Sequence, residues 1–249
     1  DRLGRWANEW QLSIAVHKCS VVRFGKNNTS HSYTLQSHSL NDVSEVTDLG
    51  LIVDHKLRFS SHYASIVRKA HKRASLILRC FKCRDIYLLT KAYLVYVRPL
   101  LEYCSPVWAP VYTGDILLMI ESVQRRFTKR LPGMNHLFHH QRLRKLNLVT
   151  LEARRLQTDL ITMFKMLNNY INIDFNDFFH ISGNVNTRGH RFKLVKLQCG
   201  NNVLLFSSAC RRIDVWNSLP DQLVNSQSIG YFKNSLKNID LSKHLIISC

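Results

Sequence analysis

The chain has 249 residues, of which 45% are hydrophobic, so it can bury a core as one large domain or as two smaller ones. Its formal net charge of +18 at pH 7 is typical of proteins that meet a polyanion, most often nucleic acid. No apolar run approaches the ~18 residues that a spanning helix needs, and no N-terminal signal-peptide pattern is present. Seven cysteines without a framework spacing indicate a reducing compartment. We therefore expect an intracellular protein, of the nucleus or cytoplasm, with no membrane partner.

The positive charge is concentrated in the middle of the chain. Residues 60–145 hold sixteen Lys and Arg but only four Asp and Glu. Residues 1–59 hold seven against six, and residues 146–249 hold twelve against seven. Two thirds of the net charge therefore lies in the central third of the chain, which is where the sequence predicts a surface for a polyanion.

The first 59 residues combine a short helix with short strands. Leu3–Leu12 has helical spacing, with two tryptophans four residues apart on one face. Val21–Phe24 has the composition of a strand, and Val46–Phe59 predicts two short strands around an Asp54-His55 turn. We expect a small α+β segment here.

Helical periodicity dominates the middle of the chain. Apolar residues recur at three- and four-residue steps from Ile66 to Phe81, after a start near Ser61. Three more helices are predicted by the same spacing and by start and stop signals: Ile86–Val97, a helix from Asp115 to Leu131, and a helix from Thr150 to Leu167. This segment predicts a helical bundle.

The last part of the chain is less regular. Phe192–Leu197 and Val203–Phe206, joined by the turn GNN, predict a hairpin, and two short helices follow near Ser208–Asn217 and Ser228–Asn238. The predicted fold is mainly α with α+β ends, divided into residues 1–59, 60–170 and 171–249.

The segment YVRPLLEYCSPVW, residues 96–108, interrupts the bundle. Each of its two prolines would cost about 3 kcal/mol in a helix interior. The segment is also too apolar for a solvated loop, and its only charges are Arg98 and Glu102. We predict a buried structural corner in which these two side chains pair, while Pro99 and Trp108 help to set the angle between helices.

Two clusters of cations occupy the predicted helices, one on the exposed side of the first and one on the last turns of the third. A solvated face is the simplest interpretation of any single lysine, and cations near a helix C-terminus need no ligand. Repulsion along one helix is nevertheless unfavourable, and a bound phosphate backbone would relieve it. We predict phosphate contacts from nine residues: Arg68, Lys69, Lys72, Arg73, Arg79, Lys82, Arg125, Arg126 and Lys129.

Several blocks resemble a known family. LGLIVDHKLRFSSHYASIVRKAHK, AYLVYVRPLLEYCSPVWAP, IESVQRRFTKRLPG and RLRKLNLVTLEARRLQTDLITMFKML resemble the C-terminal part of non-LTR retrotransposon reverse transcriptases, and the jockey-like and CR1-like LINE elements look nearest. RGHRFKLVKL and FSSACRRIDVWNSLPDQL are similar to the tail of the same proteins. The resemblance implies the end of a palm, a helical thumb that holds the product duplex, and a C-terminal tail.

The resemblance also implies which residues carry function. The family's Tyr-x-Asp-Asp signature, which holds two Mg²⁺ ions, has no counterpart here, so we expect the chain to start after it and to hold no cofactor itself. Lys18 matches a lysine that assists pyrophosphate departure, although Ala15 replaces the usual Asn. The residues similar to the primer grip are Leu49, Gly50, Val53 and Asp54. The implied partners are an RNA–DNA hybrid or duplex nucleic acid, and an upstream palm and fingers in a longer chain.

Other functions remain open. The pair Cys80 and Cys83 has no second pair at zinc-site spacing, and we expect Cys80 to face the core. His136, His139 and His140 have no acidic neighbour and are interpreted as loop and helix-start residues. The alternatives to a nucleic-acid-gripping fragment are a basic helical module that binds a protein partner, and a non-functional remnant of a truncated element.

Overall fold

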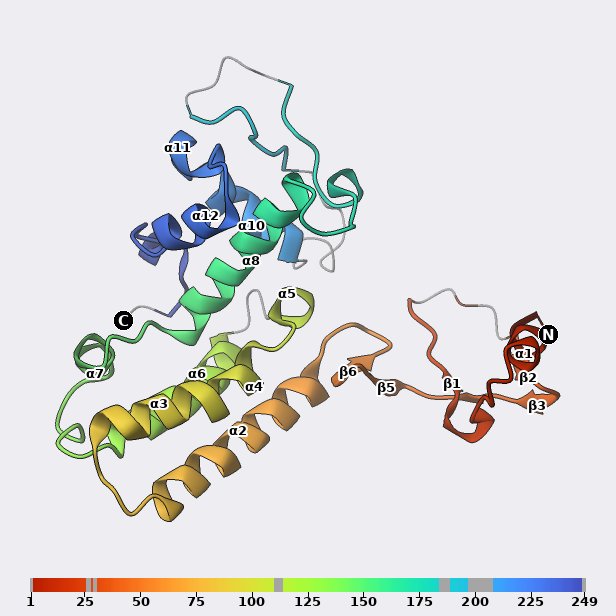
Figure 1. Cartoon of the computed structure of the whole chain (residues 1–249), viewed down its shortest axis with the longest axis horizontal. Helices are drawn as coiled ribbons and strands as arrows, with labels where there is room; N and C mark the ends of the chain where they lie inside the picture. Colours follow the sequence, from red (N-terminus) through yellow and green to blue (C-terminus); the bar gives the residue numbers. More distant parts are fainter. Residues whose placement is uncertain are drawn as a thin grey trace. The chain divides into compact units, whose positions relative to one another are not determined.

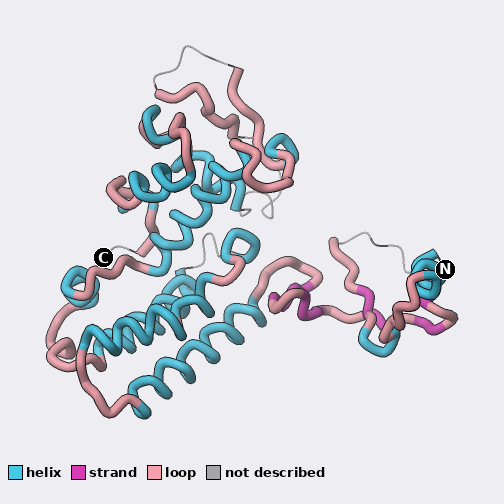
Figure 2. Tube along the Cα trace, in the orientation of Figure 1, coloured by secondary structure: helices cyan, strands magenta, loops and turns pink. Residues whose placement is uncertain are grey.

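The computed structural model describes residues 2–25, 28, 31–109, 114–183, 189–196 and 208–247. The chain forms two compact units, Asp1–Ser65 and Ile66–Cys249 (Figure 1). Helices dominate, and the named strands are short and lie in the first unit (Figure 2). This confirms the mainly α class.

Before α2, the described residues of the first unit form a helix, a 3-10 turn and six short strands. The elements in chain order are α1 Arg2–Glu9, η1 Val16–Lys18, β1 Ser20–Val21, β2 Thr34–Leu35, β3 His38–Ser39, β4 Asn41–Asp42, β5 Glu45–Asp48 and β6 Leu51–Asp54. The predicted helix and the predicted first strand are both shorter than expected. The two tryptophans of the predicted helix face are about half-exposed or more, at 49% for Trp6 and 68% for Trp10.

The strands of the first unit form three two-stranded sheets. β1 pairs with β4 in parallel, while β2–β3 and β5–β6 are antiparallel. The β5–β6 turn consists of Leu49 and Gly50, which both have positive φ, at 44° and 85°. Positive φ at both central residues is typical of a two-residue hairpin turn, because this backbone conformation matches the twist of the two flanking strands. The prediction of a turn at Asp54-His55 was therefore wrong, and the hairpin turns five residues earlier.

Asp54 has a different role, because it organises the loop that leads into the first long helix. Its carboxylate accepts hydrogen bonds from the backbone N–H groups of Lys56, Arg58 and Phe59, at 2.9, 3.0 and 2.7 Å. Partial burial by itself raises the pKa of Asp54, but these N–H groups outweigh burial and lower it.

The second unit is helical, and α2 leads into it from the first. The elements in chain order are α2 Ser60–Cys80, α3 Ile86–Tyr96, α4 Arg98–Glu102, α5 Ser105–Trp108, α6 Gly114–Lys129, α7 His139–Lys145, α8 Leu151–Leu167, η2 Phe175–Asp177, α10 Ser208–Asn217, α11 Asp221–Val224, α12 Ile229–Leu236 and η3 Ser242–His244. The four longer and two short helices predicted for this part of the chain are present as α2, α3, α6, α8, α10 and α12. The predicted hairpin falls mostly on residues 197–207, outside the described part of the chain; Leu194, at its start, instead forms an antiparallel bridge with Ile181.

The helices α2, α3 and α6 share a core. The α2 residues between Ile66 and Leu78 that recur at helical spacing are buried, as the periodicity predicts. Tyr93 of α3 stacks on Phe127 of α6 with ring centroids 4.8 Å apart, and both side chains are almost fully buried. The stripe that faces the core leaves the cations on the opposite side of α2.

A second cluster of buried residues joins α8 to the C-terminal segments. Phe164 stacks on Phe232 at 4.2 Å, and Trp216 is fully buried beside them. The helix α8, which ends at Leu167, therefore shares a core with residues beyond 171. Those residues belong to the same compact unit as the bundle, whereas the sequence predicts a division at 170/171.

His190 lies in this second cluster and makes stability depend on pH. It is 1% exposed, its Nε2 donates to the carbonyl of Trp216 at 3.0 Å, and its Nδ1 is buried without a hydrogen-bond partner among the described residues. Burial lowers the pKa of His190, so the folded state binds a proton less readily than the unfolded state, whose pKa is about 6.5. We expect the contribution of neutral His190 to the free energy of unfolding to be complete above pH ~6.5 and to be lost as the pH falls through the folded-state pKa.

The measurement is the melting temperature from pH 7.5 to 5. His190→Gln keeps an N–H donor without the titration, so its melting temperature falls less on acidification than that of the wild type. His136→Gln, at an exposed loop position, is the control and should follow the wild-type profile. Identical profiles for wild type and His190→Gln would contradict the prediction.

Residues 96–108 form the predicted corner. The two prolines lie in the first turns of the short helices α4 and α5, where a missing N–H costs nothing. Val97, Leu101 and Trp108 are buried, and Trp108 Nε1 donates to the carbonyl of Tyr103 at 2.7 Å. Only one side of the corner is buried, however. The exposed fractions of Tyr96, Tyr103 and Val107 are 52%, 57% and 56%, which corrects the expectation that they are buried.

The charges of the corner form a three-membered cluster. Arg98 Nε lies 3.6 Å from Glu102 Oε1, so the predicted pair exists. The hydrogen bonds to Glu102, however, come from Arg154 of α8, whose Nη2 donates to Oε2 at 3.0 Å and whose Nε contacts Oε1. Glu102 therefore ties the corner to α8 as well as closing a local pair.

Candidate nucleic-acid interface

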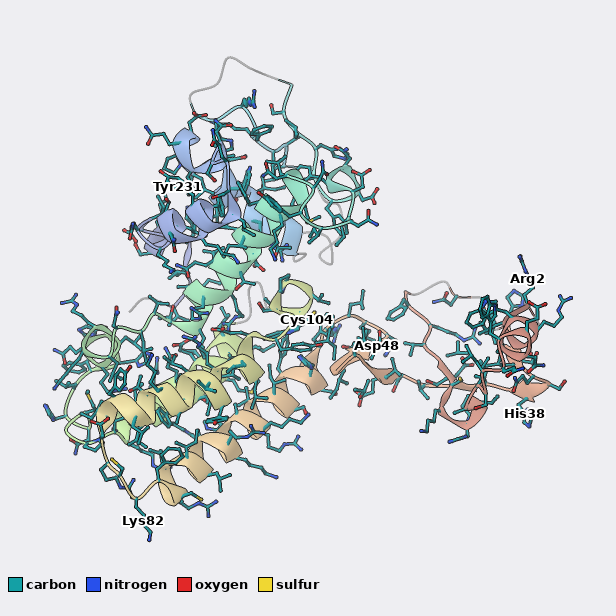
Figure 3. All side chains as sticks on the ribbon, viewed as in Figure 1. Arg2, His38, Asp48, Lys82, Cys104 and Tyr231 are labelled. Carbon is teal, nitrogen blue, oxygen red and sulfur yellow. The ribbon has the colours of Figure 1, made fainter. Side chains whose placement is uncertain are left out.

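All nine cations predicted to contact phosphates are exposed. Among the described residues, none of them forms an ion pair, since the ion pairs of that part of the chain involve other cations. Their charge is therefore not neutralised within the described part of the molecule. Figure 3 shows one of them, Lys82, at the tip of the loop after α2, pointing away from the ribbon.

Two surface hollows gather most of these cations. The first, about 300 Å³, lies between α2 and α6 and is lined by His71, Ala74, Ser75, Leu78, Val123, Arg126, Phe127, Lys129 and Arg130. The second, about 720 Å³, lies on α2 and is lined by Lys69, His71, Lys72, Arg73, Ser75, Leu76 and Arg79. His71 and Ser75 line both, so the hollows adjoin each other.

The structure thus brings together six of the nine predicted residues. Four come from α2 and two from the end of α6, although the two groups are about fifty residues apart in sequence. Arg68, Lys82 and Arg125 line neither hollow. His71, Ser75 and Arg130 line the hollows but are absent from the prediction; Arg130 stands in the same basic run as Lys129, which is the signal that identifies it.

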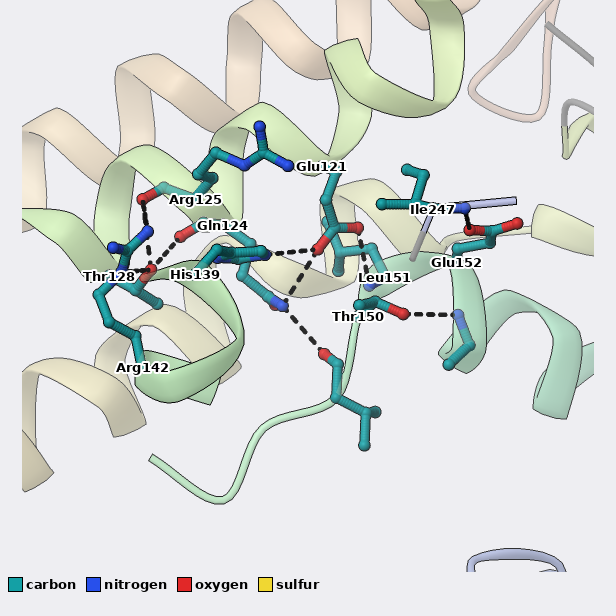
Figure 4. A network of polar contacts seen from close by, with 12 residues as sticks. Glu121, Gln124, Arg125, Thr128, His139, Arg142, Thr150, Leu151, Glu152 and Ile247 are labelled. Carbon is teal, nitrogen blue, oxygen red and sulfur yellow. Dashed lines mark hydrogen bonds and ion pairs between the residues drawn. The ribbon is translucent and has the colours of Figure 1, made fainter. Parts of the chain in front are cut away.

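A polar network holds the basic end of α6 in place (Figure 4). Arg142 of α7 is 4% exposed. Its Nε donates to Thr128 Oγ1 at 3.2 Å, its Nη2 donates to the carbonyl of Arg125 at 3.4 Å, and its Nη1 bonds the carbonyl of Leu137. Burial, with Arg125 nearby, lowers the pKa of Arg142. The guanidinium satisfies a carbonyl near the C-terminus of α6, which favours a cation there.

Glu121 is the second centre of the network and is fully buried. Its carboxylate accepts from the backbone N–H of Leu151 at 3.0 Å, from His139 Nε2 at 3.4 Å and from Gln124 Nε2 at 3.5 Å. Gln124 in turn accepts from the hydroxyl of Tyr93 at 3.1 Å. Burial is the first cause that raises the pKa of Tyr93, so its hydroxyl stays a donor. The network therefore joins α6 to α3, α7 and the start of α8.

This network was not predicted, although the spacing of polar residues along α6 contains a signal for it. Glu121, Gln124 and Thr128 recur at steps of three and four residues, in register with the buried apolar stripe of α6. Polar residues on such a face must find partners, because an unpaired buried polar group is costly.

The family resemblance also assigns roles to five residues of the first unit: Lys18, Leu49, Gly50, Val53 and Asp54. They do not line the hollows that gather the cations of α2 and α6. Lys18 is exposed in η1, just before β1. Leu49, at the tip of the β5–β6 turn, is 84% exposed, while Val53 and Asp54 end β6. Their proposed roles remain predictions.

The described residues also bear on metal binding and on membrane insertion. Within the described residues, no group of three or more His, Cys, Asp or Glu side chains is placed to hold a metal ion. Cys80 and Cys83 are exposed and free, which corrects the expectation that Cys80 faces the core: α2 ends at this residue. None of the helices in the described ranges has the length and apolar character to cross a bilayer.

Comparison with known proteins yields little. No protein family model matches the chain, and no solved structure matches it. One similar protein is an uncharacterized protein of Caenorhabditis elegans, which is 27% identical over 128 residues. The aligned residues make up 50% of this chain and 64% of that protein. The resemblance to reverse transcriptases therefore stays a prediction.

Proposed function

We propose that the chain is the C-terminal, nucleic-acid-gripping part of a non-LTR retrotransposon reverse transcriptase, with α2, α3 and α6 as its thumb. In this role it holds an RNA–DNA hybrid or other duplex through phosphate contacts. The observation that carries the proposal is the gathering of cations from α2 and α6 around two adjoining hollows, without ion-pair partners among the described residues.

Phosphate contact is the chemistry that such a surface supports. Lys and Arg neutralise phosphates and release condensed counterions, which gives affinity without sequence preference. A thumb has to slide along its product, so contacts to the backbone suit it better than contacts to base edges. The buried network behind α6 stabilises the helix that carries part of this surface.

The test is fluorescence anisotropy with a labelled RNA–DNA hybrid across a salt series at pH 7.5. If about five phosphates are neutralised, log affinity should fall against log salt with a slope of about −4.5. The triple variant Lys72→Ala, Arg79→Ala, Arg126→Ala should flatten the slope by about 2.7 units, since each contact contributes about 0.9. The loss should be the same for hybrids of different sequence.

The matched control removes three exposed cations elsewhere, in Lys233→Ala, Lys237→Ala, Lys243→Ala. It has the same net charge as the first triple variant but leaves both hollows unchanged, so its slope should stay close to that of the wild type. A wild-type slope near zero, or equal losses in both triple variants, would contradict the proposal.

A second expectation is that this chain alone does not polymerise DNA. The Tyr-x-Asp-Asp signature of the resembled family has no counterpart in the sequence, so this chain lacks the aspartates whose metal ions stabilise charge on a transferring phosphoryl group in that family. We expect no primer extension with Mg²⁺ or Mn²⁺, measured with a labelled primer on an RNA template. A heat-denatured sample is the control, and incorporation above it would show that an active centre is present.

A second candidate function, binding of a protein partner, is favoured by the exposed apolar side chains of α3 and the corner. Tyr87 and Val95 of α3 are 70% and 60% exposed, and the half-exposed Tyr103 and Val107 follow at the corner. Binding through such residues would persist in high salt, unlike phosphate contact. The salt series therefore separates the two candidates.

A further inference from the structure

The two basic hollows meet at a histidine. His71 lines both, together with Ser75, and is partly buried between α2 and α6. Its Nε2 lies 3.3 Å from Ser122 Oγ, and the Ser122 hydroxyl donates to the carbonyl of Met119 at 2.6 Å. The hydroxyl hydrogen is thus committed to Met119, so Ser122 Oγ accepts from His71 and Nε2 carries the ring proton.

The other ring nitrogen then determines what His71 can bind. In the neutral ring Nδ1 is an acceptor, which cannot bond a phosphate oxygen. In the protonated ring both nitrogens are donors and the ring carries a positive charge. A phosphate is therefore bound well by the protonated form of His71 and poorly by the neutral form.

His71 is the group of these hollows whose charge changes near neutral pH. The charged groups that line the hollows with it are Arg126 and Lys129 on α6, Arg130 directly after α6, and Lys69, Lys72, Arg73 and Arg79 on its own helix. Lysine and arginine side chains are cations near neutral pH in general, whereas histidine is the side chain that ordinarily changes charge there. Burial, followed by the charge of Arg126, lowers the pKa of His71, so the neutral ring is favoured as long as no anion lies beside it.

We propose that His71 and Ser75, which line both hollows, form with Arg126 of the first hollow a seat for a nucleic-acid phosphate, and that His71 takes up a proton when the phosphate binds. The charged groups around His71 are all positive, so they disfavour a protonated ring. A bound phosphate brings a negative charge beside the ring and thereby favours the protonated form. The inference rests on the proposed function, since it assigns a backbone phosphate to a particular place on the basic surface.

The first measurement is the affinity for the RNA–DNA hybrid from pH 8 to 5.5 at constant ionic strength. An anion close to a histidine shifts its pKa by one to three units, so the wild type should bind roughly tenfold more tightly at pH 5.5 than at pH 7.5. His71→Gln retains an amide donor but does not titrate, and should lose most of this gain. His140→Gln lies on α7 outside both hollows and should keep the wild-type profile.

The second measurement uses the wild-type protein and does not depend on the variant folding. Proton NMR follows the His71 ring as pH is varied, in the free protein, with inorganic phosphate, and with the hybrid. The midpoint should rise with either anion, and calorimetry in buffers of different ionisation enthalpy should show proton uptake on hybrid binding.

The outcomes separate this inference from the function on which it rests. Salt-dependent hybrid binding with the same pH profile in wild type and His71→Gln, and no movement of the His71 midpoint, would overturn the phosphate seat and leave the interface standing. A midpoint raised by inorganic phosphate, with no hybrid binding at any salt concentration, would support the seat and contradict the proposed function.

Discussion

We expect Asp159→Ala to destabilise the second unit by about 3–5 kcal/mol, because it leaves a buried guanidinium without its counter-charge. Arg212 Nη2 donates to Asp159 Oδ1 at 2.9 Å, and the two side chains are 6% and 0% exposed. The same Nη2 donates to the carbonyl of Pro106 at 2.9 Å. The pair thereby joins α8 and α10 to the corner, and its loss should lower the melting temperature by roughly 10 °C.

The measurement is thermal and urea unfolding followed by circular dichroism at 222 nm. Asp177→Ala, at an exposed position in η2, is the control and should change stability by less than about 0.5 kcal/mol. The double variant Asp159→Leu, Arg212→Met should recover much of the loss, since an apolar pair leaves no charge unpaired. Equal stabilities of Asp159→Ala and Asp177→Ala would show that the pair is not buried. A wild type without a cooperative transition would support the interpretation as a non-functional remnant.

The second large effect is expected at the corner. Glu102→Ala removes the carboxylate that separates Arg98 from Arg154, and the three side chains are only 19–31% exposed. Two partly buried like charges then face each other without compensation, although solvent screens part of the cost. We expect a loss of about 2–3 kcal/mol in the free energy of unfolding.

Lys82→Ala provides the comparison, because Lys82 is exposed in the loop after α2 and should be close to neutral. Glu102→Gln should fall between the two, since it keeps an acceptor but loses the charge. If Glu102→Ala and Lys82→Ala melt at the same temperature, the corner charges contribute nothing to the fold.

Local patterns predicted the helices well. The spacing of apolar residues located α2, α3, α6 and α8, because a buried helix face requires a period of 3.6 residues and leaves this mark in any tertiary context. The N-cap of α8 also depends on residues close together in sequence, since Thr150 Oγ1 accepts from the N–H of Ala153 at 3.1 Å.

The turn of the first unit shows where local patterns fail. An Asp-His pair is a common turn signal, yet Asp54 ends a strand and binds three N–H groups of the following loop. The real turn begins with Leu49, which a propensity argument does not favour at positive φ. The position of such a turn is decided together with the pairing of its two strands and the burial of one face, which single-residue preferences do not capture.

The candidate interface was predicted in part. Charge counting identified the cations of α2 and α6, because excess charge is visible in composition and helical spacing assigns it to an exposed side. It could not select the six that line the hollows, nor place His71 between Arg126 and Ser122. Those relations depend on how α2 packs against α6.

By itself, then, the sequence determined the helical class, the position of the main helices and the basic character of the central segment, all of which depend on interactions within about four residues or on composition. The tertiary structure alone decided the second partner of Glu102, which is Arg154, and the long-range partners of Glu121 and Asp159; these partners lie 52, 30 and 53 positions away. Such pairings depend on helix packing that short-range spacing does not encode, because many side chains of suitable charge compete for each buried group and only the packed fold selects one.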